Sequence, residues 1–350
     1  MKFSSFTRLG LALSILLVAT CAFAAPPTGG YHLIKKIQLA AAPGGGEYFD
    51  YITVDGNGRR VYLSHGTEVV VLNADDYSVV GTIGGFQRCH GVALVEKLGK
   101  GFIMDGDAQK VVVFDLKSLK ITGEIRANQP TDSLIYEPAT KRIFTFNGPN
   151  KNSTVIDPVK ETVIQNIDLG GEVEYPALDG KGMVYDNSQG TNEVVEIDAR
   201  AMTVRARWPV APEGQPVAMA MDSKNRRLFS AGRGPQFLVM MDADNGKVIQ
   251  SFPISAGVDA NVFEPSTGML FVSTREGMIH IFHEDSPNML SEVETVKTEY
   301  GAKTMGVDPK THNLFLTTSD FNPAAAPTEK QPHPLPTAKP GNFRVLIYGR

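Results

Sequence analysis

The sequence predicts an all-β protein that forms a single seven-bladed β-propeller. Three observations predict this fold. A turn-forming acidic residue recurs about every 42 residues, and each repeat carries short apolar strands, four in a complete repeat. The last repeat is one strand short, and the N-terminal region contains a strand that can complete it. The 350-residue chain is also 42% hydrophobic and 21% charged, which is typical of a globular protein with a substantial core.

The recurring acidic residue lies in the turn after the innermost strand of each repeat. Its carboxylate can accept hydrogen bonds from the backbone N–H groups of the turn, so we expect all seven to form turns rather than to carry chemistry. Seven such turns predict seven blades. The seven residues are Asp55, Glu96, Glu137, Asp179, Asp222, Glu264 and Asp308.

Each acidic turn is followed by further short strands of the same blade. In the first repeat a second strand covers residues 61–64, a third covers residues 70–73 and a fourth covers residues 79–83. These strands are rich in β-branched residues and are separated by Gly, Asn and Asp turns, which is the pattern of a propeller blade. In the last repeat, residues 343–348 form the third strand, and residues 33–39 at the N-terminus supply the fourth. We therefore expect the N-terminal strand to close the ring by pairing with the C-terminal blade.

The first 24 residues have the pattern of a secretory signal peptide. Lys2 and Arg8 precede an apolar run over residues 9–19, and residues 22–24 (Ala-Phe-Ala) provide a small-x-small cleavage site. The run is shorter than the roughly 20 residues that a spanning helix needs. We therefore expect cleavage after residue 24, no membrane span in the mature chain, and a periplasmic or secreted protein. Lipid attachment at Cys21 is disfavoured because Thr20 is a poor residue before a lipidated cysteine.

Cleavage would leave one propeller domain over residues 25–350 with a single cysteine, Cys89, which cannot form an internal disulfide. It would also remove two basic residues and no acid, which changes the formal charge from −4 to −6. This charge argues against nucleic acid as a partner without excluding it. The proline-rich residues 322–341 interrupt the last repeat, and we interpret them as a loop insertion rather than a lid.

The chain resembles the exported YncE-like, YVTN-repeat β-propeller proteins over nearly all of its mature length. Besides the strand and turn runs, the matching segments are residues 48–51 (Tyr-Phe-Asp-Tyr), 89–94 (Cys-His-Gly-Val-Ala-Leu), 170–172, 225–229 and 301–304. The resemblance implies an exported seven-bladed propeller. Ligand binding or DNA binding has been proposed for some members of this mostly uncharacterised family.

The repeat alignment predicts a ring of polar side chains at one mouth of the central channel. The residue five positions before each turn acid lies near the channel entrance, and equivalent residues of a propeller lie on a circle. The turns between the second and third strands open on the same face, and from them we include His65, Asn147 and Asn187 among the candidate binding residues. The polar residues at these turns are Ser64, His65, Asp105, Asn147, Asp186, Asn187, Arg275 and Asp320. The ring positions are occupied by Asp50, Gly91 with His90 beside it, Asp132, Glu174, Val217, Asp259 and Lys303.

Two readings of this ring remain open. Asp50, His90, Asp132, Glu174 and Asp259 offer oxygen and imidazole ligands that could hold Ca²⁺, Mg²⁺ or a transition metal ion. The same groups, with Lys303, could equally bind a cationic or polyhydroxylated small molecule, or a protein partner, directly. The alternative to both is that the carboxylates cap loop N–H groups or face a hydrated channel.

Other chemistry-bearing residues point to structural roles. We expect Cys89 to be a buried thiol, His280 and His283 to form a core or edge pair, and Trp208 to pack between blades. Arg59 and Arg226 are expected at solvated turn exits.

The sequence favours a non-enzymatic exported propeller that binds a ligand or protein partner at the channel mouth. The alternative is a metal-dependent hydrolase or lyase of the lactonase type, in which the ring holds a divalent ion as Lewis acid. A DNA-binding propeller is disfavoured by the acidic charge, and a quinoprotein dehydrogenase by the single tryptophan and the single mature cysteine. The chain contains no Gly-x-Ser-x-Gly elbow, P-loop, Gly-x-Gly-x-x-Gly or Cys-x-x-Cys motif.

Overall fold

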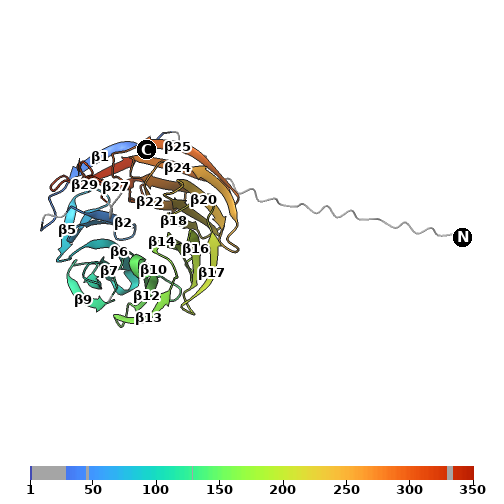
Figure 1. Cartoon of the computed structure of the whole chain (residues 1–350), viewed down its shortest axis with the longest axis horizontal. Helices are drawn as coiled ribbons and strands as arrows, with labels where there is room; N and C mark the ends of the chain where they lie inside the picture. Colours follow the sequence, from blue (N-terminus) through green and yellow to red (C-terminus); the bar gives the residue numbers. More distant parts are fainter. Residues whose placement is uncertain (2–28, 45–46, 128, 329–333) are drawn as a thin grey trace.

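A computed structural model describes the chain apart from residues 2–28, 45–46, 128 and 329–333. Seven four-stranded antiparallel sheets surround a central axis, as Figure 1 shows in a view down the ring. The predicted seven-bladed β-propeller is confirmed. The predicted signal peptide, residues 1–24, lies outside the described residues except for Met1. In the part of the chain that is described, no helix is long and apolar enough to cross a membrane.

Six blades are each built from four consecutive strands, with the first strand nearest the axis. Blade one contains β2 (Phe49–Asp55), β3 (Arg60–His65), β4 (Glu68–Asn73) and β5 (Val79–Gly84). Blade two contains β6 (Cys89–Val95), β7 (Lys100–Asp105), β8 (Lys110–Asp115) and β9 (Ile121–Arg126). Blade three contains β10 (Ser133–Glu137), β11 (Arg142–Asn147), β12 (Asn152–Asp157) and β13 (Thr162–Asp168). Blade four contains β14 (Val173–Leu178), β15 (Met183–Ser188), β16 (Glu193–Asp198) and β17 (Thr203–Pro209). Blade five contains β18 (Pro216–Asp222), β19 (Arg227–Gly232), β20 (Phe237–Asp242) and β21 (Val248–Pro253). Blade six contains β22 (Val258–Glu264), β23 (Met269–Thr274), β24 (Met278–Ser286) and β25 (Met289–Lys297).

The seventh blade joins the two ends of the chain. It consists of β26 (Met305–Val307), β27 (Leu314–Thr318), β30 (Arg344–Gly349) and β1 (His32–Gln38). The strands β1 and β30 pair antiparallel, with Ile37 opposite Val345, and blue β1 lies against the red C-terminal strands in Figure 1. The predicted closure by the N-terminal strand is therefore confirmed.

Three short elements lie outside the blades. Two 3-10 helices, η1 (Glu96–Leu98) and η2 (Gly148–Asn150), replace simple turns in blades two and three. A small hairpin of β28 (Phe321–Asn322) and β29 (Thr337–Ala338) forms the base of the proline-rich insertion. This insertion separates β27 from β30, as the sequence predicts.

The core is divided among the interfaces between neighbouring blades. Seven apolar clusters each combine strands of two adjacent blades, and the cluster between blades one and two contains Tyr62, Val92 and Phe114. Trp208 belongs to the cluster between blades four and five. A Cβ at Gly246 of blade five would overlap the Trp208 ring, so this glycine leaves room for the indole. The expected packing of Trp208 between blades is confirmed.

Most of the seven turn acids cap their own turns. Asp55 accepts a hydrogen bond from the Gly58 N–H (2.7 Å), and Glu137, Asp179, Asp222 and Asp308 likewise accept backbone N–H groups of their turns. Glu264 instead accepts the hydroxyl of Thr267. Glu96 lies exposed in η1 and accepts the side-chain amide of Asn57 from blade one.

Two arginines expected at solvated turn exits instead join neighbouring blades. Arg59 of blade one donates two hydrogen bonds, of 2.6 and 2.7 Å, to the buried carboxylate of Asp308 in blade seven. Arg226 of blade five likewise contacts Asp179 of blade four at 3.2 Å. The expectation of solvated arginines is wrong at these two positions, because the turn acid of the preceding blade lies within reach of each guanidinium.

Candidate functional site at the channel mouth

A polar cavity of about 980 Å³ opens at one end of the central channel. Six of the nine binding residues predicted from the sequence line it, and together they come from six of the seven blades. The six are Asp50, His90, Asp132, Glu174, Asp259 and Lys303. In blade five the predicted ring position is Val217, which is fully buried, and the cavity is lined there by Arg233 from the next turn.

Irregularities at the start of the inner strands direct several of these side chains into the cavity. The pairing register shifts between Phe49 and Ile52 in β2, between Cys89 and Val92 in β6, between Val173 and Pro176 in β14 and between Val258 and Ala260 in β22. Such β-bulges re-aim side chains and are common beside functional sites. They explain why His90 lines the cavity although the exact ring position is Gly91. A Cβ at Gly91 would come within 3.3 Å of the Tyr51 side chain.

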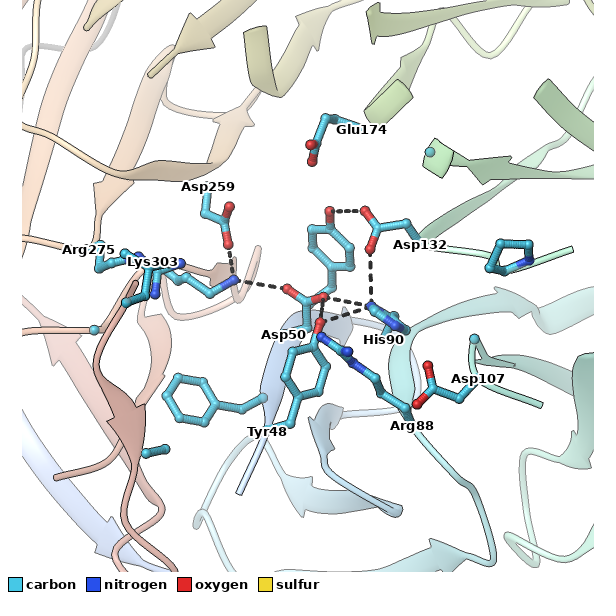
Figure 2. A pocket seen from close by; sticks show the side chains of 18 of the residues that line it. Tyr48, Asp50, Arg88, His90, Asp107, Asp132, Glu174, Asp259, Arg275 and Lys303 are labelled. Carbon is cyan, nitrogen blue, oxygen red and sulfur yellow. Dashed lines mark hydrogen bonds and ion pairs between the residues drawn. The ribbon is translucent and has the colours of Figure 1, made fainter. Parts of the chain in front are cut away.

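The centre of the site is a hydrogen-bonded cluster around His90, shown in Figure 2. His90 Nδ1 lies 3.0 Å from Asp50 Oδ2 and 3.1 Å from Asp132 Oδ1. The Tyr48 hydroxyl donates to Asp50 Oδ2 at 2.6 Å. Burial lowers the pKa of His90, but the hydrogen bonds to Asp132 and Asp50 outweigh burial and raise that pKa to about 9. At neutral pH the imidazole is therefore protonated and bridges the two carboxylates.

A second ionic cluster begins on the other side of Asp50. Lys303 Nζ lies 3.2 Å from Asp50 Oδ1 and also pairs with Asp259, which in turn pairs with Arg233. Burial raises the pKa of Asp50, but Lys303 and His90 together hold it below its usual range. Burial lowers the pKa of Lys303, and Asp50 opposes this effect. The two clusters form one continuous network of alternating charge across blades one, two, three, five, six and seven.

Glu174 faces the cavity apart from this network. Its carboxyl has no hydrogen-bond or ion-pair partner among the described residues, and Figure 2 shows it pointing into open space. Burial is the main reason that its pKa rises to about 8, and the charge of Asp132 adds to the effect. Behind it, Asp186 is fully buried with neither carboxylate oxygen hydrogen-bonded, and burial raises its pKa well above the usual value.

Two tyrosines meet across the axis at the level of the site. Tyr51 comes from blade one and Tyr175 from blade four, which lies across the ring, and their ring centroids are 4.6 Å apart. Tyr51 lines the cavity, and its hydroxyl lies 3.5 Å from Asp132 Oδ2. Of this pair, only Tyr51 is among the residues that line the cavity.

The other three predicted binding residues lie within the blades, outside the cavity lining of the described chain. His65 is buried, stacks on Phe343 and hydrogen-bonds Glu47 at 2.6 Å. The Asn147 amide donates to the side chains of Asn152 and Thr154, and that of Asn187 donates to the Ala218 carbonyl.

His65 and Asn147 lie outside the cavity because side chains alternate between the two faces of a strand. His65 and Asn147 are the last residues of β3 and β11, so their side chains point into the blade. Where these turns contribute to the lining, they do so through the residue that follows the strand. The residue at this position is Gly106 in blade two, Gly148 in blade three, Arg233 in blade five and Arg275 in blade six.

Several lining residues were missed by the sequence prediction of binding residues. Tyr48 and Arg88 precede Asp50 and His90 by two residues, and the Arg88 guanidinium lies 4.0 Å from the centre of the Tyr48 ring. Arg233 and Arg275 occupy the same position in consecutive blades, immediately after the second strand. The sequence places Arg275 at this turn without counting it among the binding residues, and the shared position is the signal by which the repeat alignment could have found Arg233.

The proline-rich insertion also reaches the site. Residues 335–338 line the cavity together with Phe321 of the short hairpin. The insertion lies on the face that carries the polar ring, as its position between the second and third strands predicts. Its Leu335 adds apolar surface to the wall beside Phe321.

Two further expectations from the sequence concern Cys89 and His280. Cys89 is buried, and burial raises the pKa of its thiol to about 12, which fits a structural thiol. His280 Nε2 lies 2.9 Å from Ser255 Oγ, and its Nδ1 lies 2.8 Å from Glu292. The order of these groups matches that of a serine nucleophile site. However, the Ser255 backbone N–H donates to the same Nε2 at 3.0 Å, so a turn contact already uses its lone pair.

The residues that could hold a metal ion are fewer than the five predicted. Only Asp50, His90 and Asp132, among the described residues, bring ligand atoms within 4.8 Å of one another. Asp259 is instead neutralised by Arg233 and Lys303. A metal ion on this trio would have to displace the proton that His90 Nδ1 shares with the two carboxylates.

Comparison with known proteins gives the fold but no family. No family model matches the sequence, and no curated protein matches it. Among solved structures, hydrazine synthase from Kuenenia stuttgartiensis superimposes with a TM-score of 0.67 at 14% sequence identity, covering 82% of this chain and 96% of that chain. As many as 1813 solved chains match, which shows how widely the fold is used and why it does not select a function.

Proposed function

We propose that this protein is an exported, YncE-like propeller that binds a small polar ligand in the cavity at its channel mouth and does not itself catalyse a reaction. The observation that carries the proposal is that the Glu174 carboxyl and the Arg275 guanidinium both face the cavity without a hydrogen-bond or ion-pair partner among the described residues. The network beside them is internally paired and consists of Asp50, His90, Asp132, Arg233, Asp259 and Lys303. Buried polar groups are normally hydrogen-bonded, so partly buried charged groups that lack partners and line a cavity indicate contacts made to a ligand.

The cavity suits a small molecule better than a protein partner. Its polar side chains lie on an inward-facing ring, and Tyr51 lines it beside them. A volume of about 980 Å³ is within the range of small-molecule sites. Protein partners instead need a broad surface of about 800 Å² on each side.

The test is thermal unfolding with a panel of probes: glycine, γ-aminobutyrate, succinate, putrescine, glucose, CaCl₂ and ZnCl₂. The variants Glu174→Gln and Arg275→Gln remove a ligand contact without removing a contact within the fold. Matched controls are Glu124→Gln on β9 and Arg205→Gln on β17, whose side chains are 51% and 61% exposed on outer strands.

A ligand at a hundred times its Kd stabilises the folded state by about 2.7 kcal/mol. At least one probe should therefore raise the Tm of the wild type and of both controls, and raise it less in a cavity variant. The proposal is wrong if no probe raises the Tm, or if every effective probe acts equally on all five proteins.

A metal-dependent hydrolase or lyase is the second candidate, and the Asp50–His90–Asp132 trio favours it. A divalent ion there would act as a Lewis acid toward an ester or lactone. Elemental analysis of purified protein decides between the two candidates. A stoichiometric ion that is lost in the Asp132→Ala/Glu174→Ala variant would support the metal enzyme, and metal-free protein would contradict it.

The proposal includes export, which rests on the sequence pattern of residues 1–24. Expression of the full chain followed by cell fractionation tests it. The mature protein should appear outside the cytoplasm and begin at residue 25. A full-length protein in the cytoplasmic fraction would contradict export and leave the binding proposal untouched.

A further inference from the structure

The charges that line the cavity are distributed unevenly around the ring. Blades five to seven contribute three basic side chains and one acid, and blades two to four contribute four carboxyl groups beside Arg88 and His90. The basic side is formed by Arg233, Arg275 and Lys303, with Asp259. The acidic side is formed by Asp107, Asp132, Glu172 and Glu174.

On the basic side, one cation is left without a partner. Arg233 and Lys303 both pair with Asp259, and Lys303 also pairs with Asp50. The Arg275 guanidinium lines the cavity with no hydrogen-bond or ion-pair partner among the described residues. A guanidinium presents a fork of N–H donors that matches a carboxylate, which makes Arg275 a site for an anionic group.

On the acidic side, the opposite charge is in excess. Arg88 stacks on Tyr48 beside Asp107, and His90 is shared between Asp50 and Asp132. Glu174 has no partner among the described side chains, and its raised pKa of about 8 leaves it largely protonated at neutral pH when no ligand is bound. An ammonium group beside it would lower this pKa and favour the carboxylate. In Figure 2, Glu174 lies above the network, Asp132 forms its right-hand end and Arg275 lies to its left.

The cavity also offers apolar surface to a ligand. Tyr51 of β2, Phe321 of the hairpin and Leu335 of the insertion all line it. These groups suit a hydrocarbon chain that joins two charged ends, because contact with them removes apolar ligand surface from water.

We propose that the ligand is a zwitterion of the amino-acid class, with its carboxylate on Arg275 and its ammonium group between Asp132 and Glu174. This inference rests on the proposed ligand-binding function and deepens it, because it names the chemical class. A ligand with one charge would leave one of the two sides unpaired, and a dianion or a dication would place a like charge against one of them.

The experiment is calorimetric titration with ω-amino acids of increasing length, from glycine to 8-aminooctanoate. Hexylamine and hexanoate serve as matched compounds with one charge. A hydrogen bond to a charged group contributes about 1.5–3 kcal/mol. The best ω-amino acid should therefore bind at least about tenfold more tightly than either single-charge compound.

Variants of the two residues show which of them binds each end of the ligand. Arg275→Gln should reduce the affinity for the ω-amino acid to that of the amine alone and leave hexylamine binding unchanged. Glu174→Gln should weaken the ω-amino acid and hexylamine and leave hexanoate unchanged. Arg275→Lys should restore part of the lost affinity, because the charge is kept while the fork of donors is lost.

The possible failures are distinguishable. If hexylamine or hexanoate binds as tightly as every ω-amino acid, the zwitterion inference is wrong, but ligand binding in the cavity stands. If no compound of the series binds, the inference is again wrong. The proposed function falls with it only if the wider probe panel also fails to stabilise the protein.

Discussion

The protonated His90 between Asp50 and Asp132 predicts a specific loss of stability at alkaline pH. The pKa of His90 is about 9 in the folded protein, against 6.5 for an ordinary histidine. The folded state therefore binds more protons than the unfolded state between these two values. Stability from this group is fully present below pH 6.5 and is lost as the pH rises through about 9.

The size of the effect follows from the shift. Each pKa unit corresponds to about 1.36 kcal/mol, so the difference between 6.5 and 9 is worth about 3 kcal/mol. Glu174 and Glu284, whose pKa values burial raises to about 8, also cost stability as the pH rises from 4.5 to about 8. These two glutamates affect the free energy of unfolding in the same way when His90 is replaced. A comparison with a His90 variant therefore isolates the pH-dependent stability that comes from the histidine.

The assay is urea unfolding at pH values from 6 to 9.5 for the wild type, His90→Gln and His32→Gln. His32 is an exposed residue of β1 and serves as the matched control. The wild type and His32→Gln should lose about 3 kcal/mol more than His90→Gln between pH 6.5 and 9.5. Parallel pH profiles for all three proteins would refute the bridging role of a protonated His90.

Three further predictions concern the blades and are measured by urea unfolding. Arg59→Ala leaves the buried Asp308 carboxylate unpaired and should lower the free energy of unfolding by roughly 3 kcal/mol; wild-type stability would rule out the link between blades one and seven. Gly101→Ala drives a methyl group into the Phe114 ring and should cost about 1 to 3 kcal/mol, so a neutral result would contradict that packing. Ile37→Ala on β1 removes a half-buried side chain from the closing strand and should cost about 1 kcal/mol; no change would mean that this strand contributes little.

The fold could be predicted from the sequence because a propeller repeats one local pattern. Each acidic turn fixes the phase of its blade, so strands β2 to β27 follow from one alignment. Closure by β1 also follows, because the last repeat ends one strand early. The same alignment predicts which residues at or just before the innermost strands surround the channel mouth, Asp132 and Lys303 among them.

The binding residues in the turns could not be predicted with the same accuracy. A one-residue error at the end of a strand moves a side chain from the cavity into the blade, and this separates His65 from the cavity lining. The β-bulges have a similar effect, since they bring His90 rather than Gly91 into the site. The pairing of charges depends on distances between blades, so the sequence alone does not show that Arg275 lacks a partner.

The central claim is that the channel-mouth cavity binds a small polar ligand through Arg275 and Glu174. The most direct measurement is a crystal structure of the protein soaked with 6-aminohexanoate, compared with an Arg275→Gln crystal soaked in the same way. We predict electron density for the ligand between Arg275 and Glu174 in the wild type, with the carboxylate end lost or displaced in the variant. A cavity that contains only water at a saturating ligand concentration would contradict the claim for this probe, and ligand density confined to other surfaces would contradict the choice of site.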